Sequence, residues 1–174
     1  MNILIIALPR TGSSELGKRL SLKHNLKYEF EPFNTTKNVA DISKFKNVVV
    51  KTIIFHLPTN VKSENRIEWL LNLTKQFDEV ILLSRKNLKD CAESWAYLIY
   101  KEKERSFKSN QTYLWERTPN YDKEYEYIQK CNDELVYISN TLNIPITFYE
   151  DIYDLKDPNR LRKGNRVDFN SSII

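Results

Sequence analysis

Short apolar segments alternate along this chain with longer segments in which apolar residues recur every three or four positions. The short segments are typical of buried parallel strands, because both faces of such strands are covered and few polar positions remain. They occupy residues 3–8, 47–52, 79–84 and 144–149, with a weaker example at 26–30. The segment over 47–52 is interpreted as the central strand.

The intervening segments have the period of amphipathic helices. These predicted helices cover residues 13–23, 64–77, 88–104 and 121–142. Strands that alternate with helices predict an α/β fold, in which right-handed crossovers place helices over both faces of a parallel sheet. We therefore expect a three-layer α/β/α architecture with a mostly parallel sheet of four to five strands. Ligands of such sheets bind at the carboxyl ends of the strands.

Two segments show neither period. Residues 105–120 mix charged, polar and aromatic positions, which predicts an exposed excursion over the strand ends. It is either a lid or acceptor-binding loop, or a plain surface loop. Residues 155–174 form a polar C-terminal tail. Since no linker or repeat separates the elements, the 174 residues are expected to form a single domain.

Composition narrows the classes of partner. Hydrophobic residues make up 41% of the chain and charged residues 29%, with a net charge of +4. This mild basic excess suits a polyanionic small molecule better than nucleic acid, which dedicated binders meet with a dense basic patch. The apolar run at 3–8 has no basic flank and is too short to span a bilayer, so we expect neither a signal peptide nor a membrane anchor.

The two cysteines, Cys91 and Cys131, lie 40 positions apart inside predicted helices. Neither belongs to a Cys-x-x-Cys pair or a Cys/His set with the spacing of metal ligands. They are expected to be packed, reduced thiols, which indicates a cytoplasmic protein without a metal site.

A tight turn joins the first strand to the first helix and forms a candidate anion site. Free backbone N–H groups and the helix dipole favour an anion at such a junction. The turn has the sequence Pro-Arg-Thr-Gly-Ser-Ser and adds donors around a single glycine, namely Arg10, Thr11, Gly12, Ser13 and Ser14. It lacks the leading glycine and the lysine of a Walker A loop, so we expect it to bind phosphate differently from an ATPase.

This turn resembles the 5′-phosphosulfate loop of sulfotransferases that use 3′-phosphoadenosine 5′-phosphosulfate (PAPS). A second strand-to-helix junction resembles the 3′-phosphate motif of the same family, with Arg85 at the strand end and Ser94 in the helix. Arginine suits this role because its planar fork binds phosphate in a bidentate manner. The segment departs from the family pattern in lacking its proline and in separating Arg85 from Ser94 by nine residues rather than eight.

Two further segments extend the resemblance to the donor nucleotide. Tyr149 begins a Tyr-Glu-Asp sequence after the last strand, and in the family this tyrosine helps to seat the adenine. Near the C-terminus, Arg162, Lys163 and Gly164 match an Arg-Lys-Gly sequence that clamps the 3′-phosphate in cytosolic members. Here the tripeptide follows the Tyr-Glu-Asp sequence more closely than it does in those enzymes.

The resemblance offers two candidates for the general base. Cytosolic sulfotransferases carry Lys-Thr-His-Leu-Pro, in which the histidine is the base; here three residues separate Lys51-Thr52 from His56. The other reading of His56 is a partly buried structural histidine. Glu31 precedes Pro32 after the second strand, where carbohydrate and bacterial members often place a Glu-Pro and some use the carboxylate as base. Glu31 is alternatively an acceptor-binding residue.

Together these motifs imply a P-loop-like sulfotransferase that moves the sulfuryl group of PAPS to a hydroxyl or amine and releases PAP, without a metal. Arg10 and the loop amides would stabilise charge on the leaving nucleotide. The acceptor is a small molecule, a sugar or a peptide. The alternatives are a non-catalytic nucleotide-binding protein of the same fold and an ATP-dependent phosphotransferase. Nucleic-acid binding through residues 97–130 is a weaker alternative, because the basic residues of this segment are scattered over helix faces.

Overall fold

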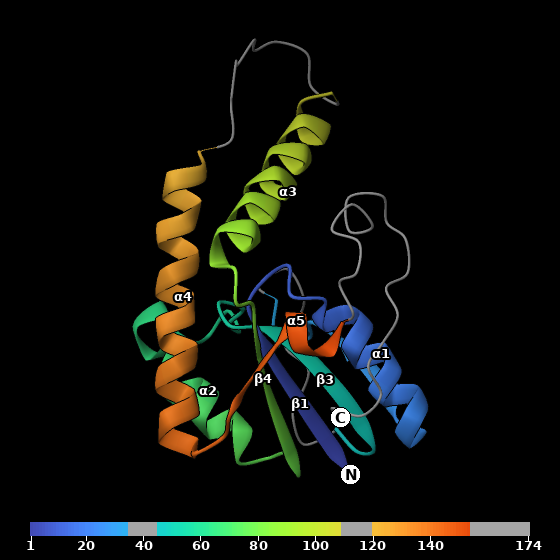
Figure 1. The fold of residues 1–174 in the computed structure, drawn as a ribbon. Helices are drawn as coiled ribbons and strands as arrows, with labels where there is room; N and C mark the ends of the chain where they lie inside the picture. The colour runs from blue at the N-terminus through green and yellow to red at the C-terminus, as the bar shows by residue number, and fades with distance from the viewer. Residues whose placement is uncertain (35–44, 109–119, 154–174) are drawn as a thin grey trace.

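A five-stranded, all-parallel sheet organises the fold, in the order β2-β3-β1-β4-β5 (Figure 1). The computed structural model describes residues 1–34, 45–108 and 120–153. The strands are β1 (Asn2–Ala7), β2 (Lys27–Phe30), β3 (Val48–Ile53), β4 (Glu79–Ser84) and β5 (Ile146–Phe148). The predicted α/β class and parallel sheet are confirmed. The central strand is β1 and not the segment over 47–52, which becomes its neighbour β3.

The helices begin and end close to the predicted positions. They are α1 (Ser13–His24), α2 (Arg66–Thr74), α3 (Leu88–Lys108), α4 (Tyr121–Leu142) and α5 (Tyr149–Ile152), and the short 3-10 turn η2 (Ser63–Asn65) precedes α2. α3 and α4 pack against each other and rise beyond the carboxyl edge of the sheet (Figure 1). None of the helices in the described ranges is long and apolar enough to cross a membrane.

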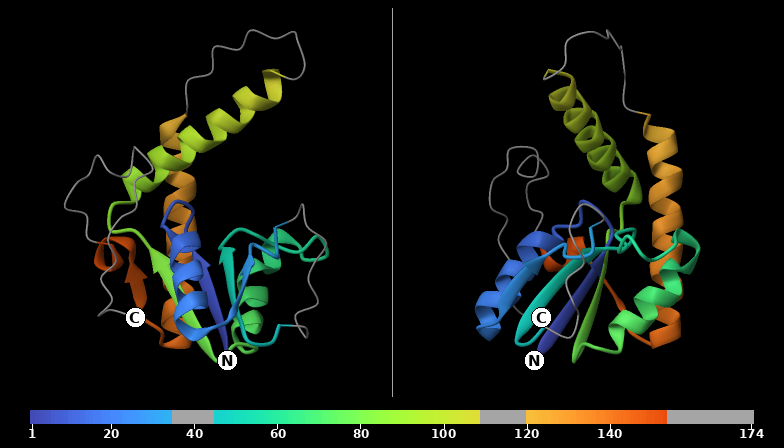
Figure 2. Two further views of the ribbon diagram at one scale, coloured as in Figure 1. Left: turned by 90° about the vertical axis from the view of Figure 1, so that its right-hand side faces the viewer. Right: turned by 180° about the vertical axis from the view of Figure 1, so that it is seen from behind.

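Both faces of the sheet are covered, because successive residues of each strand point to opposite sides. Leu4 and Ile6 of β1 belong to a core shared with α2 and α4, whereas Ile3 and Ile5 belong to a core shared with α1 and α5. Figure 2 shows α1 on one side of the sheet and α2 with α4 on the other. The near-continuous apolar sequence of β1 follows from this two-sided burial.

Several boundaries differ from the sequence-based prediction; the helix predicted over 64–77, for example, is α2 at Arg66–Thr74. The strand predicted over 144–149 is shorter, because Tyr149 already begins the helical turn α5. The excursion predicted over 105–120 is wrong at its start, since α3 continues its amphipathic period to Lys108. Residues 109–119 and the tail from residue 155 lie outside the described ranges.

The path of the chain opens a crevice beside β1. After β1 the chain turns to α1 on one face, whereas after β3 and β4 it turns to α2 and α3, whose buried residues belong to the core on the opposite face. Connections that leave neighbouring parallel strands toward opposite faces separate at the carboxyl ends, where α/β proteins bind ligands. The polar motifs of the sequence end at this edge.

Candidate functional site

A cleft of about 760 Å³ lies at the carboxyl ends of the central strands. This volume is within the range of small-molecule sites. The cleft brings together most of the residues that the sequence singled out, namely Arg10, Gly12, Ser13, Ser14, Glu31, His56, Arg85, Ser94 and Tyr149. These side chains come from five separate segments of the chain, so the fold alone makes them neighbours.

The turn after β1 has an unusual backbone. Arg10 and Gly12 both adopt left-handed conformations, with φ of 61° and 69°, and Gly12 is the N-cap of α1. A Cβ at Gly12 would lie 2.8 Å from Cε2 of Tyr149 and 2.9 Å from Cε2 of Tyr153. The turn therefore requires glycine both for its dihedral angles and for the space under two tyrosine rings.

The first turn of α1 faces the cleft through Ser13 and Ser14. The N–H groups of a helix's first turn have no partner within the helix and carry partial positive charge, which is the property the sequence-based argument relied on. Thr11 does not fit that argument as a ligand donor. Its side chain is fully buried, and its hydroxyl donates to the carbonyl oxygen of Leu8 at 2.8 Å. Thr11 therefore stabilises the turn through a hydrogen bond within it.

Arg10 joins the turn to α3. Its Nε donates a hydrogen bond to Oγ of Ser94, 84 positions further along the chain, at 2.9 Å. The resemblance assigns Arg10 to the 5′ side and Ser94 to the 3′-phosphate of one nucleotide, and here the two side chains are in direct contact. As a result, the position of α3 relative to the turn is fixed by a side chain that itself lines the cleft.

Arg85, at the end of β4, is a nearly buried cation on the wall of the cleft. Its side chain is 9% exposed, and its guanidinium carbon lies 5.0 Å from the centre of the Tyr149 ring. Its Nε is buried and has no hydrogen-bond partner among the described residues; the nearest carboxylate oxygen, of Glu150, is 3.6 Å away. A largely buried guanidinium on the wall of a cleft is suited to an anionic ligand.

A second charged group lies at the ends of β2 and β3. Lys51 is only 3% exposed and forms an ion pair with Glu31, and Nδ1 of His56 is 3.9 Å from the other carboxylate oxygen of Glu31. The parallel register makes this possible, because Phe30 pairs with Lys51 and the N–H of Glu31 donates to the carbonyl of Lys51 at 2.8 Å. Glu31 itself adopts a left-handed φ of 48°.

Lys51 was not predicted as a site residue, although the sequence-based argument placed it near the end of a strand. The available signal was a lone lysine within the otherwise apolar or neutral run of β3, whose residues are all buried. A buried lysine must be paired, so this lysine indicated a carboxylate partner without identifying it. The two predicted base candidates, Glu31 and His56, are therefore brought together with this lysine.

Aromatic side chains form the apolar wall of the cleft. Phe55 packs edge-on against His56 with ring centres 5.1 Å apart, and its ring also contacts Trp95 and Tyr127. The wall continues through Leu98 of α3. Such a surface next to charged groups excludes water from one side of the site and strengthens the electrostatic interactions there.

The groups packed around the turn remain protonated at neutral pH. Burial raises the pKa of the Cys91 thiol to about 12, and this thiol donates to the carbonyl of Pro9 at 3.0 Å. Burial also raises the pKa of Tyr149 and Tyr153, whose hydroxyl donates to the carbonyl of Gly12 at 2.9 Å. The thiol of Cys91 and the hydroxyl of Tyr153 thus hold the turn as neutral donors, and they add no negative charge next to a bound anion.

Some predicted residues are not part of this assembly. Arg162, Lys163 and Gly164 lie outside the described residues. Both cysteines are buried free thiols within helices, and His24 is exposed at the end of α1. Within the described part of the chain, no group of three acidic, histidine or cysteine side chains has the arrangement of a metal site.

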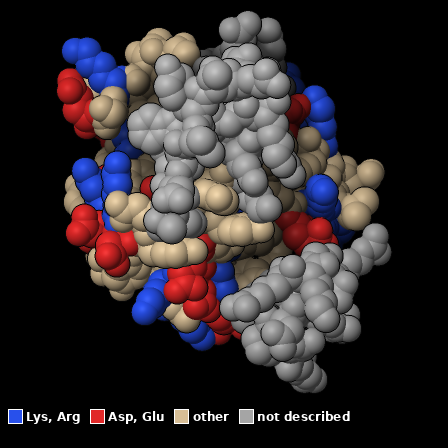
Figure 3. Space-filling model, turned by 90° about the horizontal axis from the view of Figure 1, so that it is seen from above, with Lys and Arg blue, Asp and Glu red and all other residues tan. Residues whose placement is uncertain are grey.

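The surface charge around the carboxyl edge is mixed. Seen from above (Figure 3), the visible Lys and Arg side chains alternate with Asp and Glu in small groups. The cationic groups that matter for an anion are therefore those that line the cleft, Arg10, Lys51 and Arg85, together with the exposed Lys18. Of these, Lys51 is already paired with Glu31.

Comparison with known proteins does not assign this chain to a family. The chain matches no protein-family model, and no curated protein is significantly similar to it.

Proposed function

We propose that this protein is a P-loop-like sulfotransferase that transfers the sulfuryl group of PAPS to a hydroxyl or amine of a small-molecule, sugar or peptide acceptor. The observation that carries the proposal is the arrangement of one cleft. Two arginines stand at separate places in it, one at the end of β1 and one at the end of β4, and a carboxylate–histidine pair lies beside them. A donor with phosphate groups on the 5′ and 3′ positions of one ribose suits two arginines that follow neighbouring strands.

The donor would be held by the residues that the resemblance assigns to it. Arg10 and the N–H groups at the start of α1 would bind the 5′-phosphosulfate, with Ser13 and Ser14 as further donors. Arg85 would bind the 3′-phosphate with the help of Ser94. The position of Arg85 on the cleft wall and the 9% exposure of its side chain support this placement, since a guanidinium shielded from water gains most from an ionic partner.

The reaction needs a base for the acceptor and stabilisation for the leaving nucleotide. The acceptor oxygen or nitrogen attacks sulfur, the bond from sulfur to the phosphate oxygen breaks, and the acceptor proton passes to His56 or Glu31. Arg10 and the loop amides stabilise the negative charge that grows on the departing PAP. The 3.9 Å between Nδ1 of His56 and Glu31 lets the carboxylate stabilise an imidazolium, and equally lets the imidazole assist the carboxylate.

The state of the two cysteines supports a proposal for the cellular compartment. Cys91 and Cys131 are free and buried, as is typical of proteins in a reducing compartment. We propose a cytoplasmic location on that basis, and neither a nucleic-acid nor a membrane partner.

Calorimetry with PAP and with ATP plus magnesium tests the donor. We expect micromolar binding of PAP that is lost in Arg85→Ala and kept in Lys89→Ala, an exposed lysine on the outer side of the same junction. Preference for ATP with magnesium would indicate a phosphotransferase instead.

Transfer of labelled sulfate from PAPS to a panel of acceptors tests catalysis. We expect turnover that falls at least tenfold in whichever of His56→Ala and Glu31→Ala removes the base. PAP binding without any transfer would indicate a non-catalytic nucleotide-binding protein. If neither substitution slows turnover, both base assignments are wrong.

A further inference from the structure

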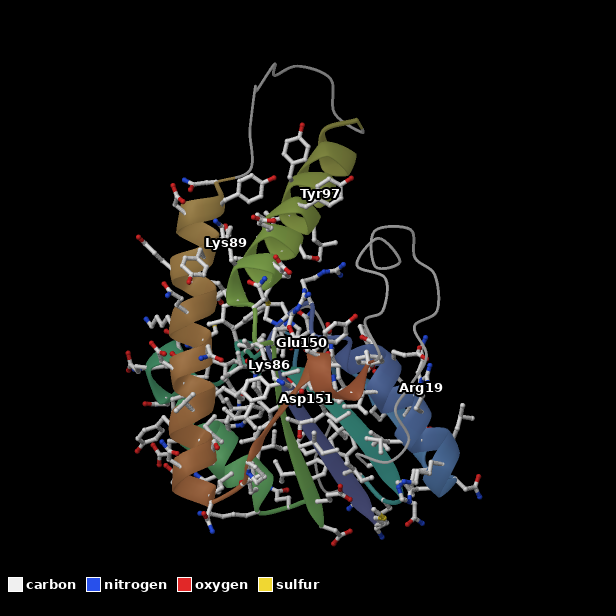
Figure 4. The ribbon with its side chains drawn as sticks, viewed as in Figure 1. Arg19, Lys86, Lys89, Tyr97, Glu150 and Asp151 are labelled. Carbon is white, nitrogen blue, oxygen red and sulfur yellow. The ribbon has the colours of Figure 1, made fainter. Side chains whose placement is uncertain are left out.

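Glu150 contacts three successive residues at the junction of β4 and α3. Its Oε2 accepts from the N–H of Lys86 at 2.9 Å, and its Oε1 accepts from the N–H of Asn87 at 3.4 Å. The same Oε1 lies 3.6 Å from Nε of Arg85. Figure 4 shows Glu150 beside Lys86, above the end of the sheet. One carboxylate thus occupies the backbone donors next to the proposed 3′-phosphate arginine.

Arg85 is held from two sides by the same short helix. The ring of Tyr149 lies under the guanidinium and the carboxylate of Glu150 lies at its Nε, and both residues belong to α5. α5 is fixed in turn, because Ser84 at the end of β4 pairs with Phe148 of β5 and Ile152 is fully buried. The arginine therefore has a defined direction before any ligand arrives.

We propose that Glu150 is a positioning residue that selects donors with a 3′-phosphate by orienting Arg85, an inference that rests on the proposed function. An arginine has a large rotamer entropy to lose when it clamps a phosphate. The ring and the carboxylate remove that freedom in the free protein. Binding of a 3′-phosphate then loses less entropy, whereas a nucleotide without that phosphate gains nothing from the arrangement.

The charge of Glu150 argues in the opposite direction, and the experiment must separate the two effects. A carboxylate close to a phosphate site repels the ligand, so its removal would raise affinity if repulsion dominated. Here its charge is shared among two backbone N–H groups and a guanidinium, which offset it locally. Orientation therefore outweighs repulsion, and loss of the carboxylate lowers affinity.

The test compares binding of PAP and AMP, which differ only in the 3′-phosphate, by calorimetry on the full chain. For Glu150→Ala we expect PAP affinity to fall roughly three- to tenfold relative to AMP. Glu150→Gln keeps one acceptor oxygen for a backbone N–H and should lie between Glu150→Ala and the unchanged protein. Asp151→Asn is the matched control, since its carboxylate pairs with the side chain of Lys86 and not with Arg85; its PAP preference should be unchanged.

A double variant shows whether Glu150 acts through the arginine. In an Arg85→Ala background the micromolar binding of PAP is lost, so PAP and AMP are compared at millimolar concentration, and there Glu150→Ala should lower the ratio of PAP to AMP affinity no further. A purely structural role would weaken both nucleotides together and leave their ratio unchanged, which would overturn the inference. A rise in PAP affinity in Glu150→Ala would overturn it as well. If the unchanged protein does not prefer PAP to AMP, the proposed function itself fails.

Discussion

Gly12 shows how strongly a single position constrains the candidate site. Its φ of 69° is unfavourable for any residue with a Cβ, and the rings of Tyr149 and Tyr153 occupy the space that a Cβ would need. The same residue caps α1 and accepts the hydroxyl of Tyr153. The backbone conformation of the turn, the start of α1 and the packing of the two tyrosine rings therefore all depend on the absence of a Cβ at Gly12.

Gly12→Ala is expected to destabilise the protein by roughly 2–4 kcal/mol. The left-handed conformation costs an alanine about 1–2 kcal/mol, and displacement of two packed rings costs about as much again. Urea denaturation measures the change. Lys18→Ala, an exposed position on the same helix, is the control and should remain within about 0.5 kcal/mol. An equally small effect at Gly12 would show that the rings move freely.

Lys51→Met is expected to cost about 2–3 kcal/mol of unfolding free energy. Loss of one partner leaves the Glu31 carboxylate unpaired, which in a fully buried pair costs about 3–5 kcal/mol, and the 15% exposure of Glu31 to the cleft reduces that cost. Chemical denaturation at neutral pH provides the measurement. The double variant Lys51→Met, Glu31→Gln should recover part of the loss. Lys62→Met removes an exposed pair and should have little effect.

The site residues differ in how far they could be predicted from sequence. Arg85 and Gly12 were predictable because their roles depend on local order, a strand end and a turn. The pairing of Lys51 with Glu31 was not, because it depends on which strands become neighbours and in what register. Thr11 was predicted as a ligand donor, but its side chain is buried and its hydroxyl donates to the carbonyl of Leu8 in the same turn, since a turn's side-chain directions depend on its dihedral angles.

Among the elements, α2 and α4 are joined by a charged contact in addition to apolar packing. Arg66 donates to the carboxylate of Glu134, and the two side chains are 15% and 18% exposed. Hydrogen bonds to charged groups contribute more than neutral ones, and a guanidinium left alone at this depth loses its compensation. The contact therefore fixes the two helices on the face of the sheet opposite α1.

Glu134→Ala is expected to destabilise the protein by about 2 kcal/mol, because it leaves the guanidinium of Arg66 without its ionic partner. Thermal or urea unfolding checks this value. Asp133→Ala, the exposed neighbouring acid on α4, should change stability by less than about 0.5 kcal/mol. Equal effects of the two substitutions would mean that the loss of negative charge, and not the contact, is responsible.

Helix and strand boundaries were predictable where the apolar period is unbroken, as it is for α4. The boundaries were not predictable where the two-residue period of a strand passes directly into the 3.6-residue period of a helix. The apolar residues at the end of β5 continue into Tyr149, although this residue starts a helical turn and its ring packs against Arg85 and Gly12. Similarly, α3 continues past its predicted end to Lys108.

At the scale of the whole molecule, burial of weak acids links stability to alkaline pH. Burial raises the pKa of Cys91 from 9.0 to about 12, that of Cys131 from 9.0 to about 11, and that of Tyr28 from 10.0 to about 12. Above the unfolded pKa values the unfolded chain releases protons that the folded chain keeps. The contribution of these groups is therefore complete below about pH 9 and decreases as pH rises toward 11–12.

We expect the unfolding free energy to fall above pH 9 by about 1.4 kcal/mol per pH unit for each buried thiol. Urea titrations at pH 8, 9 and 10 provide the slope. The double variant Cys91→Ala, Cys131→Ala should have a shallower slope even if it is less stable at pH 8. A slope that does not depend on the thiols would mean that both ionise as freely in the folded chain as in the unfolded one.

The hydroxyl of Tyr153 reaches the carbonyl of Gly12 across 141 positions of sequence. The ribosome synthesises the chain from the N-terminus, so the glycine turn emerges long before the tyrosines that cover it. Until β5 joins the edge of the sheet, the turn has no ring above it and Arg85 has no neighbour to orient it. The cleft is therefore completed only after residues 149–153 have been synthesised and have packed against the turn and Arg85.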